Sequence, residues 1–232
     1  VTCAALTPEL LIYGTARGTV SIVLLQSLAT VRTLRHRGGA VTALFPNALG
    51  TRVVLLDALG GGHLYHPASE VVLPMPKLPA QTQAVLWDAA DPNVLVAYDG
   101  KALTTHLHEP LRLSGAEVVP VGGAPTPLAG APILLLDGVV TSQTRSGAVA
   151  TTPLATHSAI LAVAERGGAS AEGLRACYVQ NVALCRLQAA YDVAAALRDE
   201  ALMRAVGEEA LRTLDVALAT RAFRQLGDAA LV

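Results

Sequence analysis

Short apolar segments separated by turn residues fill the first two thirds of the chain. The first four cover residues 1–6, 10–14, 19–25 and 30–34, and Ala16-Arg17-Gly18 forms a hairpin-type turn between the middle two. A second set covers residues 41–45, 52–57, 62–66 and 70–73. A third set covers residues 84–87, 94–98, 102–106 and 116–121. Because four strands recur every 40 to 45 residues, the spacing predicts the blades of a β-propeller.

The fourth set of apolar segments is incomplete. Residues 133–137, 139–144 and 149–154 supply three strands, and the pattern then becomes helical. Propellers commonly close their ring with a strand from the other end of the domain, which removes an open sheet edge. We therefore expect residues 1–154 to be the C-terminal blades of a WD40-type β-propeller, with the missing strand supplied from upstream of Val1. A start without Met agrees with a piece of a longer protein, and its strand-like pattern argues against a signal peptide.

Helical periodicity replaces the strand pattern in residues 155–232. The predicted helices cover residues 159–164, 172–186, 189–198, 200–211 and 214–226. Ser170 has the chemistry of an N-cap for the second of these, with Glu172 in its first turn.

An internal echo organises the last helices. Four residues recur 29 positions later with apolar character retained: Leu187, Ala190, Ala194 and Leu197 correspond to Val216, Ala219, Phe223 and Leu226. The spacing i, i+3, i+7, i+10 lines one face of a helix, and an Asp that can cap the next helix follows each set. Such units bury their apolar stripes only by stacking, so residues 155–232 are predicted to begin an α-solenoid of helical hairpins. The fold class is thus multidomain, β then α.

Composition and charge narrow the function. A content of 52% hydrophobic residues can supply a substantial core, and the net charge is −1. Basic and acidic residues are evenly distributed, so neither half carries the excess that binding to nucleic acid favours. No apolar run approaches the ~20 residues of a membrane span. The three cysteines are not at metal-ligand spacing and suit reduced thiols.

Four histidines are the first candidates for chemistry. His106 and His108 would share one face of a strand, an arrangement that can bind zinc, but no cysteine or carboxylate cluster lies at a supporting spacing. We expect both to be surface residues at the end of a strand. His63 and His66 flank another short strand, and their parity places them on opposite faces.

Two glycine runs and one dipeptide resemble known motifs. Gly60-Gly61-Gly62 and Gly122-Gly123 lack the following helix with Lys-Ser/Thr that a nucleotide loop requires, so both are interpreted as turns. Trp87-Asp88 resembles the dipeptide of WD repeats, yet it ends the first predicted strand of its blade and not the third. Trp87 is predicted to be a core residue, and Asp88 to begin a turn.

The helical part offers no recognisable catalytic set. Cys177 and Cys185 are predicted to share the buried side of one helix as structural thiols. A cysteine nucleophile needs a base, and nothing places His157 beside either thiol. Glu208-Glu209 is interpreted as a solvated helix face. The sequence therefore predicts no catalytic, cofactor-binding or metal-binding residue, no cofactor and no enzymatic activity.

Several stretches carry a family resemblance that extends over nearly the whole chain. They include VTCAALTPELL at residues 1–11, VLVAYDGKALTTHLHEP at 94–110, PILLLDGVVTSQTRSGAVATTPLATH at 132–157 and VQNVALCRLQAAYDVAAALRDEA at 179–201. The chain resembles the intraflagellar transport protein 144 family, also called the WD-repeat protein 19 family. The match would place residues 1–154 at the end of the second propeller and the helices at the start of the family's helical repeats.

This resemblance implies a function. Family members are subunits of the IFT-A complex with two tandem propellers and a solenoid of tetratricopeptide-like repeats, and they serve retrograde ciliary transport and ciliary import of membrane-protein cargo. The implied partners are other IFT-A subunits, with IFT-B, the dynein motor and membrane-protein cargo as further candidates, at the cilium and ciliary base on the cytoplasmic side. The 29-residue echo is shorter than a 34-residue tetratricopeptide repeat and lacks its consensus Trp and Pro, so a coatomer-like α-solenoid describes these helices equally well.

Two other functions stay open at this point. A vesicle-coat or tethering subunit has the same propeller and solenoid architecture, and fold alone does not fix function. A propeller enzyme would need acidic or histidine side chains converging on the central channel. The predicted innermost strands, at residues 1–6, 41–45 and 84–87, are almost wholly apolar, which disfavours the enzyme.

Overall fold

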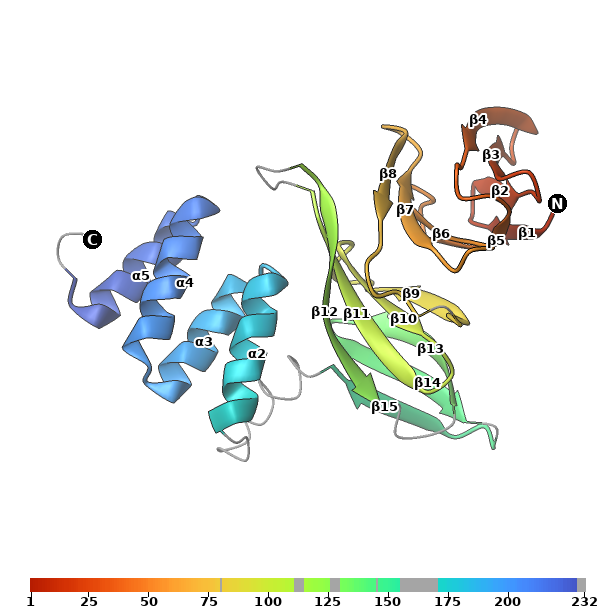
Figure 1. Ribbon diagram of the computed structural model, residues 1–232. Helices are drawn as coiled ribbons and strands as arrows, with labels where there is room; N and C mark the ends of the chain where they lie inside the picture. Colours follow the sequence, from red (N-terminus) through yellow and green to blue (C-terminus); the bar gives the residue numbers. More distant parts are fainter. Residues whose placement is uncertain (80, 111–114, 126–129, 145, 155–170, 229–232) are drawn as a thin grey trace. The chain divides into compact units, whose positions relative to one another are not determined.

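The computed structural model describes residues 1–232 except 80, 111–114, 126–129, 145, 155–170 and 229–232 (Figure 1). The chain separates into two compact units, Val1–Thr152 and Pro153–Val232. Strands fill the first unit, and helices fill the described part of the second unit after residue 170. The predicted fold class, strands first and helices second, is confirmed.

The described strands form four antiparallel sheets in which consecutive strands are neighbours. The first sheet contains β1 (Cys3–Leu6), β2 (Leu10–Gly14), β3 (Thr19–Leu24) and β4 (Ala29–Arg35). The second contains β5 (Val41–Pro46), β6 (Val53–Asp57), β7 (Gly62–His66) and β8 (Val71–Pro74). The third contains β9 (Ala84–Trp87), β10 (Val94–Tyr98), β11 (Ala102–Glu109) and β12 (Glu117–Pro125). The fourth contains β13 (Gly130–Leu136), β14 (Val139–Thr144) and β15 (Val149–Pro153).

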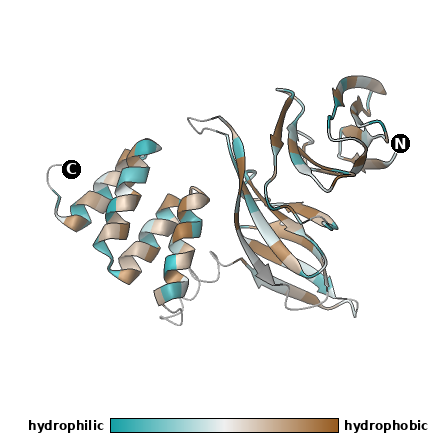
Figure 2. Ribbon diagram, in the orientation of Figure 1, coloured by the Kyte–Doolittle hydropathy of each residue, from teal (hydrophilic) through white to brown (hydrophobic). Residues whose placement is uncertain are grey.

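The four sheets are arranged as successive propeller blades. Strand β1 contacts β5, β5 contacts β9 and β9 contacts β13, so the first strand of each sheet lies beside the first strand of the next. Each sheet corresponds to one predicted set of four or three strands, and β11, β12 and β13 extend further than predicted. Hydrophobic residues recur along the strands of this unit (Figure 2).

Neighbouring blades share hydrophobic cores because alternate side chains of one strand point to opposite faces of its sheet. On β6, Val53 and Leu55 belong to a core that also contains Ile12 of the first blade. The residue between them, Val54, belongs to a different core with Leu95 of the third blade. Every residue of β6 is therefore buried, and the second blade is stabilised from both sides.

Four described helices follow in the second unit: α2 (Ala171–Ala183), α3 (Leu187–Leu197), α4 (Glu200–Arg212) and α5 (Val216–Leu226). Each contacts the next along the chain, as expected of stacked helical pairs. Asp199 caps α4 by accepting hydrogen bonds from the backbone N–H groups of Ala201 and Leu202 at 3.1 and 3.3 Å. The helix predicted at residues 159–164 and the Ser170 cap lie outside the described residues.

The 29-residue echo has the predicted burial at most of its positions. The buried members are Leu187, Ala190, Ala194, Ala219 and Phe223. Leu197 and Leu226 are half-buried and pack against the same core. The prediction is wrong for Val216, which is 61% exposed. Val216 is the first residue of α5, and at this end of the helix Leu218 is the side chain that enters the core.

Close packing of α4 against α5 depends on a glycine. A Cβ atom at Gly207 would lie 2.8 Å from Cζ of Phe223, whose side chain is fully buried. The variant Gly207→Ala gains helix propensity of up to about 1 kcal/mol, but overpacking a core costs about 1–3 kcal/mol. We expect the opening free energy of α4 and α5 to fall by about 1 kcal/mol in the full-length protein, measured by hydrogen exchange with mass spectrometry.

Two further variants make this test specific. Glu208→Ala changes the adjacent exposed residue on α4 and should leave exchange in α5 unchanged. Phe223→Leu combined with Gly207→Ala should recover part of the lost protection, because leucine lacks the far end of the ring. Greater protection of α5 in Gly207→Ala alone would show that the contact is not tight.

Candidate functional site

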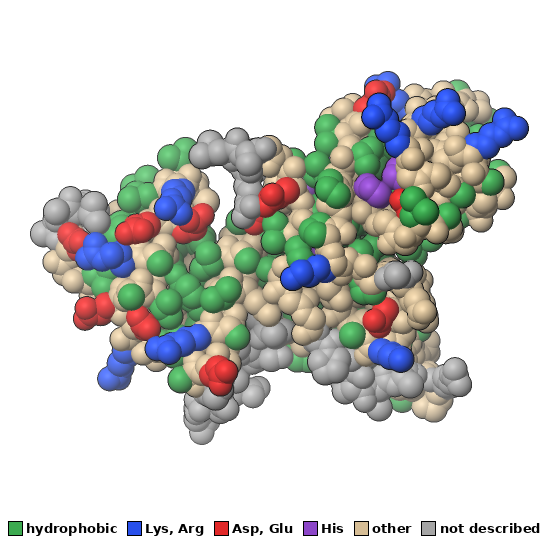
Figure 3. All heavy atoms as spheres, viewed as in Figure 1, with side chains coloured by type: hydrophobic (Ala, Val, Ile, Leu, Met, Phe, Trp, Pro, Cys, Tyr) green, Lys and Arg blue, Asp and Glu red, His purple; other side chains and the backbone are tan. Residues whose placement is uncertain are grey.

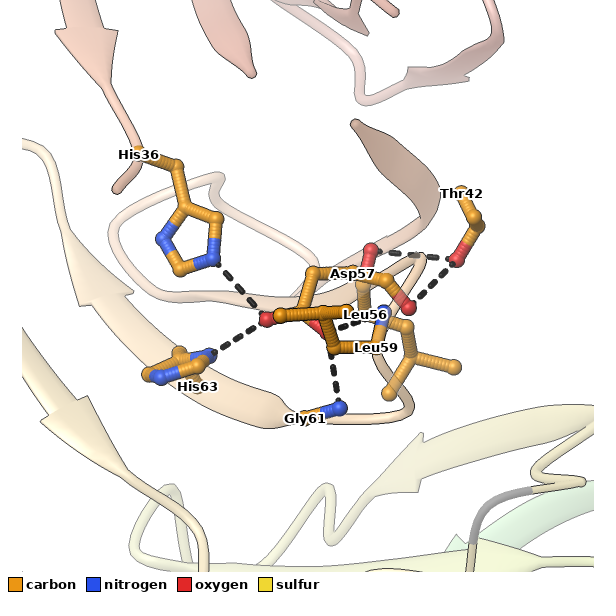
Figure 4. A network of polar contacts seen from close by, with 7 residues as sticks. All are labelled: His36, Thr42, Leu56, Asp57, Leu59, Gly61 and His63. Carbon is orange, nitrogen blue, oxygen red and sulfur yellow. Dashed lines mark hydrogen bonds and ion pairs between the residues drawn. The ribbon is translucent and has the colours of Figure 1, made fainter. Parts of the chain in front are cut away.

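Three ionisable side chains meet at the β6–β7 turn of the second blade (Figure 4). Asp57 is the last residue of β6, and its Oδ1 atom accepts hydrogen bonds from the backbone N–H groups of Leu59 at 3.0 Å and Gly61 at 2.8 Å. An aspartate that bonds backbone N–H groups ahead of it in this way stabilises a tight turn. The sequence therefore places a carboxylate at this corner for a local reason.

Two histidines approach the other oxygen of the same carboxylate. His36 follows β4 of the first blade, and its Nε2 atom lies 3.1 Å from Oδ2 of Asp57. His63 lies on β7, and its Nδ1 atom is 3.9 Å from the same oxygen. The imidazole rings of His36 and His63 are 4.6 Å apart between centroids and nearly edge to face. This His36–Asp57–His63 cluster connects the exit of the first blade to the turn of the second.

The cluster is largely shielded from solvent. The side chains of His36 and Asp57 are 6% and 3% exposed, and that of His63 is 24% exposed. Burial alone would raise the pKa of Asp57, but the hydrogen bonds from His36, Gly61 and Leu59 outweigh burial, and this pKa lies below its usual value. Burial, followed by the neighbouring His36, lowers the pKa of His63, although Asp57 opposes the shift.

Chemically, the cluster is a hydrogen-bonded pair with a second imidazole beside it. The hydroxyl of Thr42 donates to the carbonyl oxygens of Leu56 and Asp57, so its proton is directed away from the imidazoles. A His–Asp pair acts as a general base only when a nucleophile or substrate proton lies within hydrogen-bond distance. Of the described residues, only this group of three places metal-ligating atoms close together.

A second histidine pair lies between the second and third blades. The rings of His66 on β7 and His108 on β11 are 4.8 Å apart between centroids. Both ring nitrogens of His108 and Nε2 of His66 are buried without a hydrogen bond among the described residues. Burial, with Arg52 and His66 nearby, lowers the pKa of His108 to about 4. His63 and His66 thus contact different partners.

The surface positions predicted for His106 and His108 are wrong, because both side chains are buried. Strand β11 continues to Glu109, beyond the predicted end at residue 106, and pairs with β10 on one side and β12 on the other. The ring nitrogens of His106 lie 3.2 Å from the carbonyl oxygen of Pro76 and 3.3 Å from that of Thr104. His106 is therefore a core histidine with backbone partners.

The two glycine runs have different outcomes. Gly60 and Gly61 form the turn after β6, as predicted, and Gly60 has a φ angle of +79°. The turn predicted at Gly122-Gly123 is wrong, because these residues lie inside β12 and pair with Thr105 and Thr104. The register shifts between Thr105 and His106, and glycine in a strand commonly accompanies such an irregularity.

Trp87 and Asp88 connect the third blade to its neighbours. Trp87 is half-buried, packs against the core shared with the second blade and donates to the carbonyl oxygen of Phe45 at 3.3 Å. Asp88 begins the predicted turn, accepting from the N–H of Ala90 at 2.8 Å. Its buried carboxylate also accepts from the backbone N–H groups of Asp137 and Gly138, both at 2.9 Å, in the turn of the fourth blade.

In the helical unit, the shared burial predicted for the two cysteines is wrong. Cys177 is buried, whereas Cys185 is exposed, because α2 ends at Ala183 and Cys185 has a φ angle of +55°. His157 lies outside the described residues. Glu208 is exposed, and Glu209 forms an ion pair with Arg212 at 2.9 Å. Basic and acidic side chains are interspersed over this unit on the face shown in Figure 3.

Sequence reasoning missed His36 and Asp57. The signal that could have found them is a histidine a few residues before the first strand of a blade, combined with an aspartate at the end of its second strand. The glycine at position 38 belongs to the same signal. A Cβ atom there would lie 2.3 Å from Nε2 of His36 and 2.4 Å from Oδ2 of Asp57, so only glycine lets the backbone approach.

None of the described helices is long and apolar enough to cross a membrane. Consecutive four-stranded meander sheets whose first strands lie side by side define a β-propeller protein. A family model described as the second β-propeller of WDR19 matches residues 1–157, and the chain belongs to this family. The family predicted from the sequence is confirmed.

Relatives match along the whole chain. Human WD repeat-containing protein 19 is 31% identical over 234 residues, covering 100% of this chain and 17% of the human protein. WD repeat-containing protein dyf-2 of Caenorhabditis elegans is 22% identical over 98% of this chain and 16% of its own length. The chain thus spans about a sixth of these relatives. The β-propeller domain of Myceliophteria thermophila Cps50 (Swd1) aligns with a TM-score of 0.46 at 12% identity, over 66% of this chain and 53% of that one.

Substituting Gly38 should separate His36 from Asp57. The added methyl group of Gly38→Ala would overlap both polar atoms, and leaving a buried charged group unsatisfied costs about 1–3 kcal/mol or more. We expect hydrogen exchange in β5–β7 to accelerate correspondingly in the full-length protein. In the control Gly123→Ala, the new Cβ atom would lie 3.5 Å from a carbonyl oxygen, an ordinary contact. Unchanged protection in Gly38→Ala would contradict the close approach.

Acid should loosen the contact between the second and third blades. The folded pKa of His108 is about 4 against 6.5 for a free histidine, so the unfolded state binds more protons between these values. The contribution of neutral His108 to stability is complete above pH 6.5 and is lost as the pH falls towards 4. Opening of β7 and β11, measured by hydrogen exchange corrected for intrinsic rates, should therefore become easier from pH 7 to pH 5.

Internal controls accompany this pH prediction. Helices α2–α5 contain no histidine and should change less over the same pH range. The variant His108→Leu removes the titrating ring and should flatten the pH dependence in β11, whatever its effect on absolute stability. An equal pH dependence in the wild-type protein and in His108→Leu would assign the effect to other groups.

Proposed function

We propose that this chain is a non-catalytic scaffold segment of an IFT-A subunit that acts in retrograde ciliary transport and in ciliary import of membrane-protein cargo. The observation that carries the proposal is the order of parts: propeller blades of the WDR19 family are followed by stacked helical pairs. Stacked helices of this kind present extended surfaces for holding partners. Matching relatives cover both parts of the chain.

The proposal includes the domain boundaries and the partners. Residues 1–154 are proposed to be the C-terminal blades of the propeller, and residues 155–232 the beginning of an α-solenoid. Other IFT-A subunits are the proposed partners, with IFT-B, the dynein motor and membrane-protein cargo as further ones, at the cilium and ciliary base on the cytoplasmic side. The chain matches 17% of the length of human WD repeat-containing protein 19, so the proposal concerns the contribution of this segment alone.

The polar chemistry of the described residues supports a role without catalysis. His36 and Asp57 are satisfied by each other and by backbone N–H groups, and both are buried. His106 lies within hydrogen-bond distance of two backbone carbonyl oxygens. Groups used in this way stabilise blades, whereas a catalytic group must reach a substrate.

Breaking one helix tests the scaffold role. Ala219 of α5 is buried, and its N–H donates to the carbonyl oxygen of Asp215 at 3.0 Å. Ala219→Pro removes this bond, and proline within a helix costs about 3 kcal/mol or more. In cells that express the full-length variant, we expect IFT-A subunits to co-purify poorly and cargo to accumulate at ciliary tips.

The matched control is Glu208→Ala on α4, which removes an exposed charge and should leave assembly and transport intact. Normal assembly and transport in Ala219→Pro would refute the scaffold role of these helices. Loss of vesicle-coat or tethering subunits, with IFT-A intact, would support the alternative assignment. Loss of transport in Glu208→Ala with the complex assembled would indicate a cargo or chemical site on this surface.

A further inference from the structure

Three atoms that commonly bind metals point at one another in the His36–Asp57–His63 cluster. Nε2 of His36, Oδ2 of Asp57 and Nδ1 of His63 all lie within 4.8 Å of one another (Figure 4). We propose that this corner of the second blade binds one Zn²⁺ ion. This proposal does not depend on the proposed transport function, because it is argued only from three side chains of the second blade and of the segment that leads into it.

The donor set and its spacing fit zinc. Imidazole nitrogens and carboxylate oxygens bind Zn²⁺ at about 2.0–2.2 Å, which places neighbouring ligand atoms of a tetrahedral site about 3.4 Å apart. The two distances to Oδ2 of Asp57, 3.1 Å from His36 and 3.9 Å from His63, lie on either side of this value. The third separation, between Nε2 of His36 and Nδ1 of His63, is within 4.8 Å, so rotation of the two imidazoles about their side-chain bonds must close this gap for all three atoms to coordinate one ion.

The two carboxylate oxygens of Asp57 have different partners. Oδ1 of Asp57 accepts the backbone N–H groups of Leu59 and Gly61, which fixes its orientation. Oδ2 faces both imidazoles. Hydrogen bonds that orient a ligand in this manner are a regular feature of metal sites.

An unsatisfied nitrogen distinguishes a metal site from a purely structural His–Asp pair. Such a pair needs only His36 and Asp57, yet Nδ1 of His63 is buried beside them without a hydrogen bond. A buried polar atom without a partner is unfavourable, and coordination to a metal would satisfy it. Zn²⁺ would replace the His36–Asp57 hydrogen bond with bonds to all three side chains.

The cluster also has room for an ion and a route by which the ion can enter. Glycine at position 38 keeps a side chain out of the volume next to Nε2 of His36 and Oδ2 of Asp57. The side chain of His63 is 24% exposed, so ions can enter on its side. A solvent water can fill the fourth position of a tetrahedral site with three protein ligands.

Metal content of the full-length protein tests the proposal. The wild-type protein and the variants His63→Ala and His66→Ala are stripped with a chelator, dialysed against Zn²⁺ and analysed by mass spectrometry for zinc per chain. His66 is the matched control, because it lies on the same strand but outside the cluster. We expect His63→Ala to hold one equivalent less than both other proteins. Co²⁺ should give tetrahedral absorption bands with the same dependence on the variants.

A second measurement locates the ion and checks folding. Hydrogen exchange without metal should be similar in β5 for all three proteins, which shows that the blade is folded. Added Zn²⁺ should then slow exchange in β5–β7 of the wild-type protein and His66→Ala but not of His63→Ala. Equal zinc content in the wild-type protein and His63→Ala, or an equal loss in His66→Ala, would overturn the proposal.

Discussion

Burial of β6 on both of its faces is the constraint on which the propeller unit depends. A meander sheet of four strands is a thin layer, and each layer here gains its core from the next one, since Val53 and Leu55 pack with the first blade and Val54 with the third. The turns that join these strands must therefore be held tightly. Asp57 and Asp88 do so with carboxylates whose partners include backbone N–H groups.

The helical unit also buries its apolar side chains between neighbouring elements, which here are helices and not sheets. Consecutive helices from α2 to α5 contact one another, and their buried side chains form one core along the described stack. Where two helices come closest, one of them must carry a small residue, and Gly207 against Phe223 meets that need. Blades and helices thus both rely on neighbours in sequence, which is why a single periodic signal identified each region.

The sequence predicts the features that depend on local periodicity. It does not predict burial that depends on contacts with other blades. The strand sets, the helices and the burial of Ala219 and Phe223 follow from spacing alone. Spacing shows which side chains share a face but not what covers that face. The sequence therefore assigns His106 and His108 to the surface, whereas His66 of the second blade packs on His108 and the carbonyl oxygen of Pro76 lies against His106. His36 and Asp57 were missed because each lies in a polar turn and they meet only after two blades have packed.

The buried carboxylate of Asp88 has a consequence for the order of folding. It belongs to the end of β9, and its partners Asp137 and Gly138 are synthesised 49 and 50 residues later. His36 and Asp57 form another contact between consecutive blades, the first and the second, across 21 residues. Because the N-terminus of the chain leaves the ribosome first, the first residue of each contact is available before its partner. The second and fourth blades can then each be completed against a blade that has already left the ribosome.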